Sequence, residues 1–384
     1  MTPGRFRPIE QPAILALLAW LAVLLASSSA WAVEVQTRSE DLALEINALV
    51  QPRIEVDSGG SPEDAAPSGR ANIDFYIRRA AWAMRGTAYQ RFNFGVVVTA
   101  VRIGERGKLN ASPFLQDVRV GYLLAKDVNV EMGLLFLPLT RAALTNPTQQ
   151  SSIEGGADIL LYNHARNLHD TGIQVRALLL DGRILVRGGY FEGARNNNPD
   201  GVPPLNPDGI PLAAGMVRWN LVGEEAPYAY PSIYLDEKTR ISIGAGGHYQ
   251  PHSGALRPGT GAYDDYLALA ADLFADVALA PDHEAILMVG GYRFNYGAGN
   301  GKTGHGMQGE VGYRWGPVEP QGNFYWFNSD TKQNSYLKIA GGLNVFLQGH
   351  RAKIQAEYAR IIANANLATT PPLHQVIVQT QLAF

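Results

Sequence analysis

Seven charged residues lie on the polar side of segments in which apolar and polar side chains alternate. They are Arg78, Arg119, Glu131, Arg176, Arg187, Lys353 and Glu357. Successive side chains of a β-strand point to opposite faces, so we expect these seven to share one face of their sheet. Five are basic and two are acidic, a surplus that favours attraction of anions.

A second group of candidates lies in segment 138–170, the longest stretch without a strand pattern inside the barrel portion of the chain. It contains Arg141, Glu154, Asp158, His164, Arg166 and His169. Loops longer than about 15 residues inside a compact domain are usually functional. Folded into a wide barrel, this loop would set the width and charge of the lumen. The alternative is a loop exposed at the surface.

Two motifs resemble binding sites but fail on context. Residues 299–304 match the glycine spacing of nucleotide-binding loops, but a P-loop needs a glycine where Tyr296 stands, and a strand is expected where a helix should follow. His248 and His252 are four residues apart at the end of a strand, so they do not share a helical face. We therefore expect no metal site, no cofactor and no enzymatic activity. Catalytic groups brought together only in space stay possible on sequence grounds.

The elements that carry these residues are predicted to be β-strands. The last eleven residues alternate strictly and end on Phe384, and similar patterns recur between turn signals along the chain. Sixteen such segments are 44–56, 73–83, 88–103, 114–125, 128–137, 171–180, 183–193, 212–221, 239–249, 264–279, 284–296, 305–315, 321–327, 335–347, 351–362 and 374–384. The pattern predicts an all-β transmembrane antiparallel barrel of about 16 strands, with one face toward lipid and the other toward water.

The connections support this count. Short turns, such as 126–127 and 181–182, alternate with long links that read as extracellular loops, of which 138–170 is the third. One link on the short side, 222–238, is too long for this rule, so either a strand is misdrawn there or the link is an ordered plug or turn. Arg79 falls on the apolar side of its strand. An arginine in lipid costs about 2 to 4 kcal/mol at the midplane, so a β-bulge or a place near the interface is expected there.

The N-terminus indicates export. Arg5 and Arg7 precede the apolar run 13–26, and residues 30–32 form a small-x-small cleavage site. We expect a signal peptide at 1–32, a linker at 33–42 and a barrel at 43–384 in the outer membrane of a Gram-negative-type bacterium; an uncleaved anchor is the alternative. The chain has no cysteine, which excludes disulfides and thiolate metal sites. Removal of 1–32 leaves a net charge of −4, so no nucleic-acid partner is expected.

Four segments resemble the phosphate-selective porin O/P family. They are 75–80, 116–122, 130–139 and 170–175. The resemblance implies a sixteen-stranded, trimeric outer-membrane porin whose third external loop folds into the channel and whose basic residues guide anions. This chain departs from the pattern, because its loop mixes Arg141 and Arg166 with Glu154 and Asp158.

Three functional hypotheses follow. The first is a porin for passive diffusion of small hydrophilic solutes or anions, in contact with outer-membrane lipid and recognised by the barrel-assembly machinery through the strand that ends at Phe384. The second is a plugged structural or adhesive barrel, in which 138–170 and 222–238 fill the lumen. The third is a soluble, secreted β-sandwich.

Overall fold

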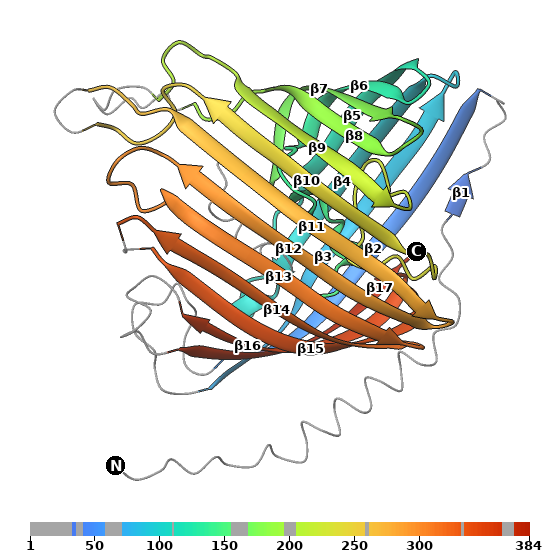
Figure 1. Cartoon of the computed structure of the whole chain (residues 1–384). Helices are drawn as coiled ribbons and strands as arrows, with labels where there is room; N and C mark the ends of the chain where they lie inside the picture. Colours follow the sequence, from blue (N-terminus) through green and yellow to red (C-terminus); the bar gives the residue numbers. More distant parts are fainter. Residues whose placement is uncertain are drawn as a thin grey trace, which may run out of the picture.

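Sixteen long antiparallel strands form a closed barrel (Figure 1). The computed structural model describes residues 33–35, 41–57, 71–109, 111–154, 168–195, 205–257, 261–331, 334–362 and 372–384. Each strand from β2 to β17 pairs with its neighbour in the chain. The barrel closes where β17 pairs with β2, from Gln375 opposite Asp57 to Ala383 opposite Leu49. This closure confirms the predicted fold class. It gives the backbone of the described strands hydrogen-bond partners within the wall, as a lipid environment requires.

The strands have the following bounds: β1 Val33–Val35, β2 Leu42–Asp57, β3 Asn72–Ala88, β4 Phe92–Ile103, β5 Phe114–Ala125, β6 Val128–Phe136, β7 His169–Leu179, β8 Ile184–Phe191, β9 Leu212–Val222, β10 Arg240–Gln250, β11 Tyr266–Ala280, β12 His283–Asn295, β13 Gly304–Trp315, β14 Val318–Ser329, β15 Tyr336–Gln348, β16 Ala352–Ile362 and β17 Leu373–Ala383. Three short 3-10 helices are η1 Glu105–Gly107, η2 Ala142–Leu144 and η3 Pro147–Gln149.

All sixteen predicted strands are present, with shifted ends. Strand β5 has the predicted bounds, whereas β3 continues to Ala88, so the turn expected at 85–87 lies at 89–91 instead. The short strand β1 falls inside the predicted linker 33–42 and pairs antiparallel with β2. Of the described helices, not one has the length and apolar character needed to cross a membrane.

The alternation in the sequence corresponds to the two faces of the wall. On β17, Val376 is 44% exposed, whereas Gln379 and Gln381 are 3% and 1% exposed. The glutamines point into the lumen, where they bond to Arg53 and Gln51 of β2. Apolar side chains therefore cover the outer surface and polar side chains the inner one.

A β-bulge interrupts β3 at Arg78. Gln51 of β2 lies opposite Arg79, while the next residue, Pro52, lies opposite Ile77, so Arg78 has no partner in the register. The extra residue exchanges the two faces of β3. Before it, Phe75 is 66% exposed on the outside; after it, Trp82 is outside at 41%. The bulge expected from the position of Arg79 is confirmed.

Candidate functional site in the barrel lumen

The third external loop enters the lumen. Its described part, 137–154, is held by side chains of the opposite wall: Asn344 and Gln355 donate to the Ser151 carbonyl at 2.9 and 3.0 Å. Lys353 donates to the Gln150 carbonyl at 2.6 Å, and the Ile153 amide donates to Glu357 at 3.1 Å. The predicted inward fold of this loop is confirmed for these residues.

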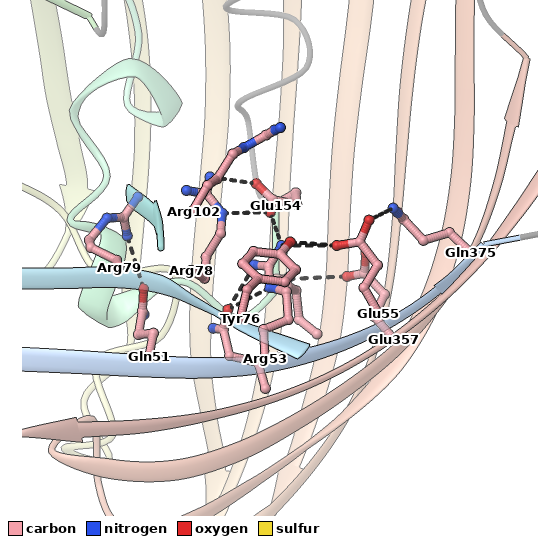
Figure 2. A network of polar contacts seen from close by, with 12 residues as sticks. Gln51, Arg53, Glu55, Tyr76, Arg78, Arg79, Arg102, Glu154, Glu357 and Gln375 are labelled. Carbon is pink, nitrogen blue, oxygen red and sulfur yellow. Dashed lines mark hydrogen bonds and ion pairs between the residues drawn. The ribbon is translucent and has the colours of Figure 1, made fainter. Parts of the chain in front are cut away.

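The loop reaches the near wall at Glu154. Arg78 donates to its carboxylate at 3.0 and 3.2 Å, and Arg53 bonds to it as well. Figure 2 shows Arg53 and Arg78 converging on this carboxylate, while the Tyr76 hydroxyl donates to Glu55 and Arg79 lies apart, bonded to Gln51. Burial alone would raise the pKa of Glu154, but the two guanidiniums hold that pKa well below its usual range.

The long link between β9 and β10, residues 223–239, also enters the lumen, from the other end of the barrel. It pairs with the loop through three backbone hydrogen bonds. The Tyr230 amide donates to Leu144 O at 3.0 Å, the Asn146 amide to Tyr230 O at 3.0 Å, and the Ser232 amide to Gln149 O at 2.8 Å. We call 137–154 and 223–239 together the partition. The length of this link left two interpretations open: a wrongly placed strand, or an ordered plug or turn. In the structure the link is an ordered plug.

A buried charge cluster joins the two halves of the partition to the wall. Arg141 of the loop donates to Glu225 of the link at 2.7 Å, and these side chains are 0% and 2% exposed. Arg218 of β9 bonds to Glu225 at 3.4 Å and also to Asp272 of β11. Burial would raise the pKa of Glu225, but Arg141 and Arg218 keep that pKa below its usual value. The cluster is therefore charged and internally paired.

Tyr228 of the link is held by one acidic and two basic residues of the wall. Its hydroxyl donates to Asp117 at 2.8 Å, and the Arg119 guanidinium lies 3.6 Å from the centre of its ring. Arg187 donates to the carbonyls of Pro227, at 2.6 Å, and Tyr228. These contacts fix the link against β5 and β8.

Apolar contacts complete the partition. Ala142 and Ile233 pack in a buried cluster with Phe274, Ile286, Met288 and Phe346 of the wall. Leu144 and Tyr230 pack in another, and both are 0% exposed. Apolar burial of this kind stabilises a segment by about 25 cal/mol per Å², so the partition is packed like a protein core.

The seven predicted lumen charges all have partners in the structure. Those that contact the partition directly are Arg78, Arg119, Arg187, Lys353 and Glu357. Arg176 and Glu131 form an ion pair with each other at 3.0 Å. The side chains point inward as expected, but the charges anchor the partition as well as facing the lumen.

The predicted loop residues divide into three groups. Arg141 and Glu154 lie inside the lumen, as described above. His169 is not a loop residue: it is the first residue of β7, is 6% exposed, and its ring lies 3.9 Å from that of Phe136. The prediction placed it wrongly because β7 begins two residues before the alternation becomes regular. Asp158, His164 and Arg166 lie outside the described residues.

Sequence reasoning missed the carboxylates on the far wall. Buried acidic side chains there are Asp272, Asp276, Glu284, Glu310 and Glu319. Their positions on β11 to β14 alternate with exposed apolar residues, so the same parity rule identifies them. The seven-residue count of five basic to two acidic was therefore incomplete. The same rule identifies Arg218 as facing inward, because its neighbours Val217 and Trp219 are exposed apolar residues.

An open space remains between the partition and the wall formed by β2 to β5. This cavity has a volume of about 180 Å³. Residues on its wall side include Arg79, Arg85 and Asp117, and on the partition side Asn146, Thr148 and Tyr228. We call it the side passage.

The two rejected motifs have ordinary roles. Residues 299–303 form a turn that leads into strand β13 at Gly304, where a nucleotide-binding loop would need a helix. His248 is buried and its Nε2 bonds to Pro138 O at 3.2 Å, whereas His252 lies beside Asp208 at 3.3 Å.

No protein-family model matches the sequence, and no curated protein matches it. Solved structures match the fold. OprB of Pseudomonas putida aligns with a TM-score of 0.61 at 8% identity, over 90% of this chain and 94% of that chain. OmpF of Salmonella typhi aligns with 0.59 at 10%, over 92% and 100%. The anion-selective porin from Comamonas acidovorans aligns with 0.54 at 11%, over 90% and 100%. At these identities the likeness establishes the fold alone, and that fold is the barrel of the outer-membrane porins.

Proposed function

We propose that this chain is an outer-membrane porin for passive diffusion of small hydrophilic solutes and ions, with a preference for anions and no covalent chemistry. The observation that carries the proposal is the side passage, which leaves room beside the partition inside a barrel with an apolar outer face. A water-filled space lined by charged groups lowers the barrier for ions that would not enter lipid. One structural neighbour is an anion-selective porin by its description, which supports the same preference here.

Single-channel recording in planar bilayers tests the proposal. The refolded protein should give discrete conductance steps, and a KCl gradient should give a reversal potential of the sign for chloride preference. Clear potassium preference would overturn the anion preference. Absence of conductance steps, with the barrel shown to be folded by its heat-dependent migration on gels, would overturn the porin.

The resemblance to the phosphate-selective O/P family supports a narrower form of the proposal, in which phosphate is one of the permeating anions. The mixture of Arg141 and Glu154 in the loop argues for weak selectivity, because each is already paired with an opposite charge. Conductance in KCl, compared before and after addition of phosphate, tests this form. A phosphate-selective channel would lose chloride conductance as phosphate occupies it.

A homotrimer is proposed as the assembly. One structural neighbour is described as a trimer form, and the resemblance implies the same state. Light scattering with correction for bound detergent should give the mass of three chains.

We also propose that residues 1–32 are removed, that 33–42 lead into the barrel at 43–384, that 138–170 is the constriction loop, and that the terminal strand is recognised by the barrel-assembly machinery. N-terminal sequencing of the membrane form tests the first of these divisions.

The plugged structural barrel is a second candidate because one specific observation favours it. The partition is built from both predicted plugging segments, and its charge cluster and apolar clusters are buried. Swelling of liposomes in sugars of graded size separates the two functions. A porin admits the smaller sugars, whereas a plugged barrel admits none.

A further inference from the structure

We propose that ions cross this barrel through the side passage, and that Arg79 and Arg85 are the residues that set its preference for small anions. This inference rests on the proposed porin function and deepens it. It assigns the preference to two residues outside the predicted set of seven. Three features support it: the fixed partition, the partners of the wall charges, and the position of the acidic wall.

The partition is fixed against the wall of β9 to β16. Opening a path on that side would separate Glu225 from Arg218 of β9, side chains that are 2% and 0% exposed, and break the bonds that Asn344 and Gln355 donate to the Ser151 carbonyl. Leaving a buried charge without its partner is strongly unfavourable. Ions are therefore confined to the side of the partition that faces β2 to β5, where the side passage lies.

Few charges remain available along this passage. Arg79 donates to the Gln51 side chain at 3.2 Å and forms no ion pair among the described residues. Arg85 is exposed and forms no ion pair within the described part of the chain. Glu45 stands opposite Arg85 in the register, but its carboxylate accepts from Asn47 at 2.9 Å and forms no ion pair with Arg85 in the described part of the chain. Among the described residues, neither guanidinium is paired with a carboxylate, and both line the passage.

Asp117 is the one acidic side chain among the described residues that line the passage, and it already has a hydrogen-bond partner. Asp117 accepts the Tyr228 hydroxyl at 2.8 Å, and Arg119 lies against that same ring. The carboxylate is held at the hydroxyl end of Tyr228, and its charge is offset by the neighbouring Arg119 guanidinium. Among the described residues that line the passage, two arginines therefore stand against one carboxylate, a net positive charge.

The acidic wall is covered by the loop. Glu310 and Glu319 are 3% and 0% exposed, and the loop lies over them: the Ser152 hydroxyl contacts Glu310 at 3.4 Å. Asn344, which holds the Ser151 carbonyl, also bonds to Glu319 at 2.8 Å. Carboxylates that would attract cations are thus separated from the side passage by the partition.

The ligand class follows from the chemistry of the two residues. Guanidinium groups stay protonated and donate several N–H bonds in a plane, which suits chloride and, better, oxyanions such as acetate and phosphate. A cavity of about 180 Å³ accommodates ions of this size. The passage is therefore assigned to small anions.

The test compares reversal potentials of single-residue variants and their double variant in a KCl gradient. Arg79→Gln, Arg85→Gln and the double variant should each lower the ratio of chloride to potassium permeability, with a combined fall of roughly threefold to tenfold, because one charge a few ångströms from an ion changes its energy by this order in water. Potassium acetate and potassium phosphate in place of KCl then distinguish carboxylates from phosphate.

Arg293→Gln is the matched control. Arg293 lies on the outer face of β12, 45% exposed, and pairs with Asp330 at 2.7 Å, so this change removes one positive charge without altering the lumen. Its permeability ratio should equal that of the unchanged protein. Heat-dependent gel migration checks that every variant forms the barrel, and Arg85→Gln alone keeps the test decisive if Arg79→Gln fails to fold.

The possible results separate the inference from the function on which it rests. Conducting variants with an unaltered permeability ratio would overturn the assignment to Arg79 and Arg85 and leave the porin standing. An equal change in Arg293→Gln would overturn it too, because the effect would then come from overall charge. An unchanged protein that forms a barrel without conductance would overturn the proposed function itself.

Discussion

Charged residues in this lumen mainly form ion pairs and hydrogen bonds that join one segment of the protein to another. Glu225 is the clearest example, because it receives Arg141 from the loop and Arg218 from the wall, while Ser242 also bonds to it. A single carboxylate of the link thus joins the distant loop to strands β9 and β10. Its removal should affect both the stability of the partition and the width of the passage.

We predict that Glu225→Gln loosens the partition. Removal of one partner from a buried ion pair costs about 3 to 5 kcal/mol, so the folded band should be lost at a lower temperature and single-channel conductance should rise. Glu224→Gln is the control, because the Glu224 side chain, next to Glu225 in the sequence, is exposed. Equal stability and equal conductance in the two variants would show that the cluster does not hold the partition.

The acid dependence of Glu154 gives a second prediction. Its pKa in the folded state is depressed by Arg78 and Arg53, after allowance for burial, so the carboxylate contributes stability that is fully present above the unfolded pKa of about 4.3. That contribution is lost as the pH falls from there through the lower folded pKa.

Accordingly, Glu154→Gln should destabilise the protein by about 2 kcal/mol equally at pH 7 and pH 5, and the difference should shrink below about pH 4.3. Thermal unfolding in detergent at a series of pH values measures it. A difference that already disappears between pH 7 and pH 5 would contradict the depressed pKa.

At the residue level, the sequence identified which charges face inward but not what they contact. Parity alone placed Arg119 and Lys353 on the inner face, because every second residue of a strand points there. Their partners are Tyr228 and the Gln150 carbonyl. These lie in the link and the loop, where apolar and polar residues do not alternate, so the sequence gives no indication of which wall residue they contact. The positions were predictable and the pairings were not.

At the level of elements, the strands were the predictable part, since a wall between lipid and water imposes a period of two. The link 223–239 was not, because a segment buried by irregular contacts has no repeating pattern. Its length was the one signal. The bulge at Arg78 shows that a break in parity also carries information: an arginine on the apolar face marked the place where the faces exchange.

Gly133 of β6 supports a prediction about the wall itself. Its φ is +138°, and a Cβ atom there would lie 1.9 Å from Val118 O of β5. Gly133→Ala should therefore separate the two strands and cost about 2 to 5 kcal/mol through strain and overpacking, measured as a lower urea midpoint and a lower yield of folded barrel.

Gly291→Ala on β12 is the matched control, because a Cβ atom at this glycine meets nothing within 4 Å. It should fold as the unchanged protein does. A Gly133→Ala variant of equal stability would show that the contact between β5 and β6 at this point relaxes easily.

At the scale of the whole molecule, the lumen is divided by charge as well as by space. Arg79 and Arg85 of β3 face the side passage, and the carboxylates of β11 to β14 lie beneath the partition. The loop and the link enter from opposite ends of the barrel and meet inside it. The dimensions of the pore thus depend on both segments together, and removal of either should change them.

The last prediction removes one of these segments. Replacement of 223–239 by a two-residue turn, like 126–127 between β5 and β6, should leave the barrel folded, since the strand pairs of the wall do not include the link. Conductance should rise severalfold, and liposomes should admit larger sugars, because the loop loses its backbone partners and the space occupied by Tyr228, Tyr230 and Ile233 is opened. If the unchanged protein admits no sugar and the shortened one does, the plugged barrel is the correct function. If both admit the same sugars at the same rate, the link does not restrict the lumen, and the side passage is not the route.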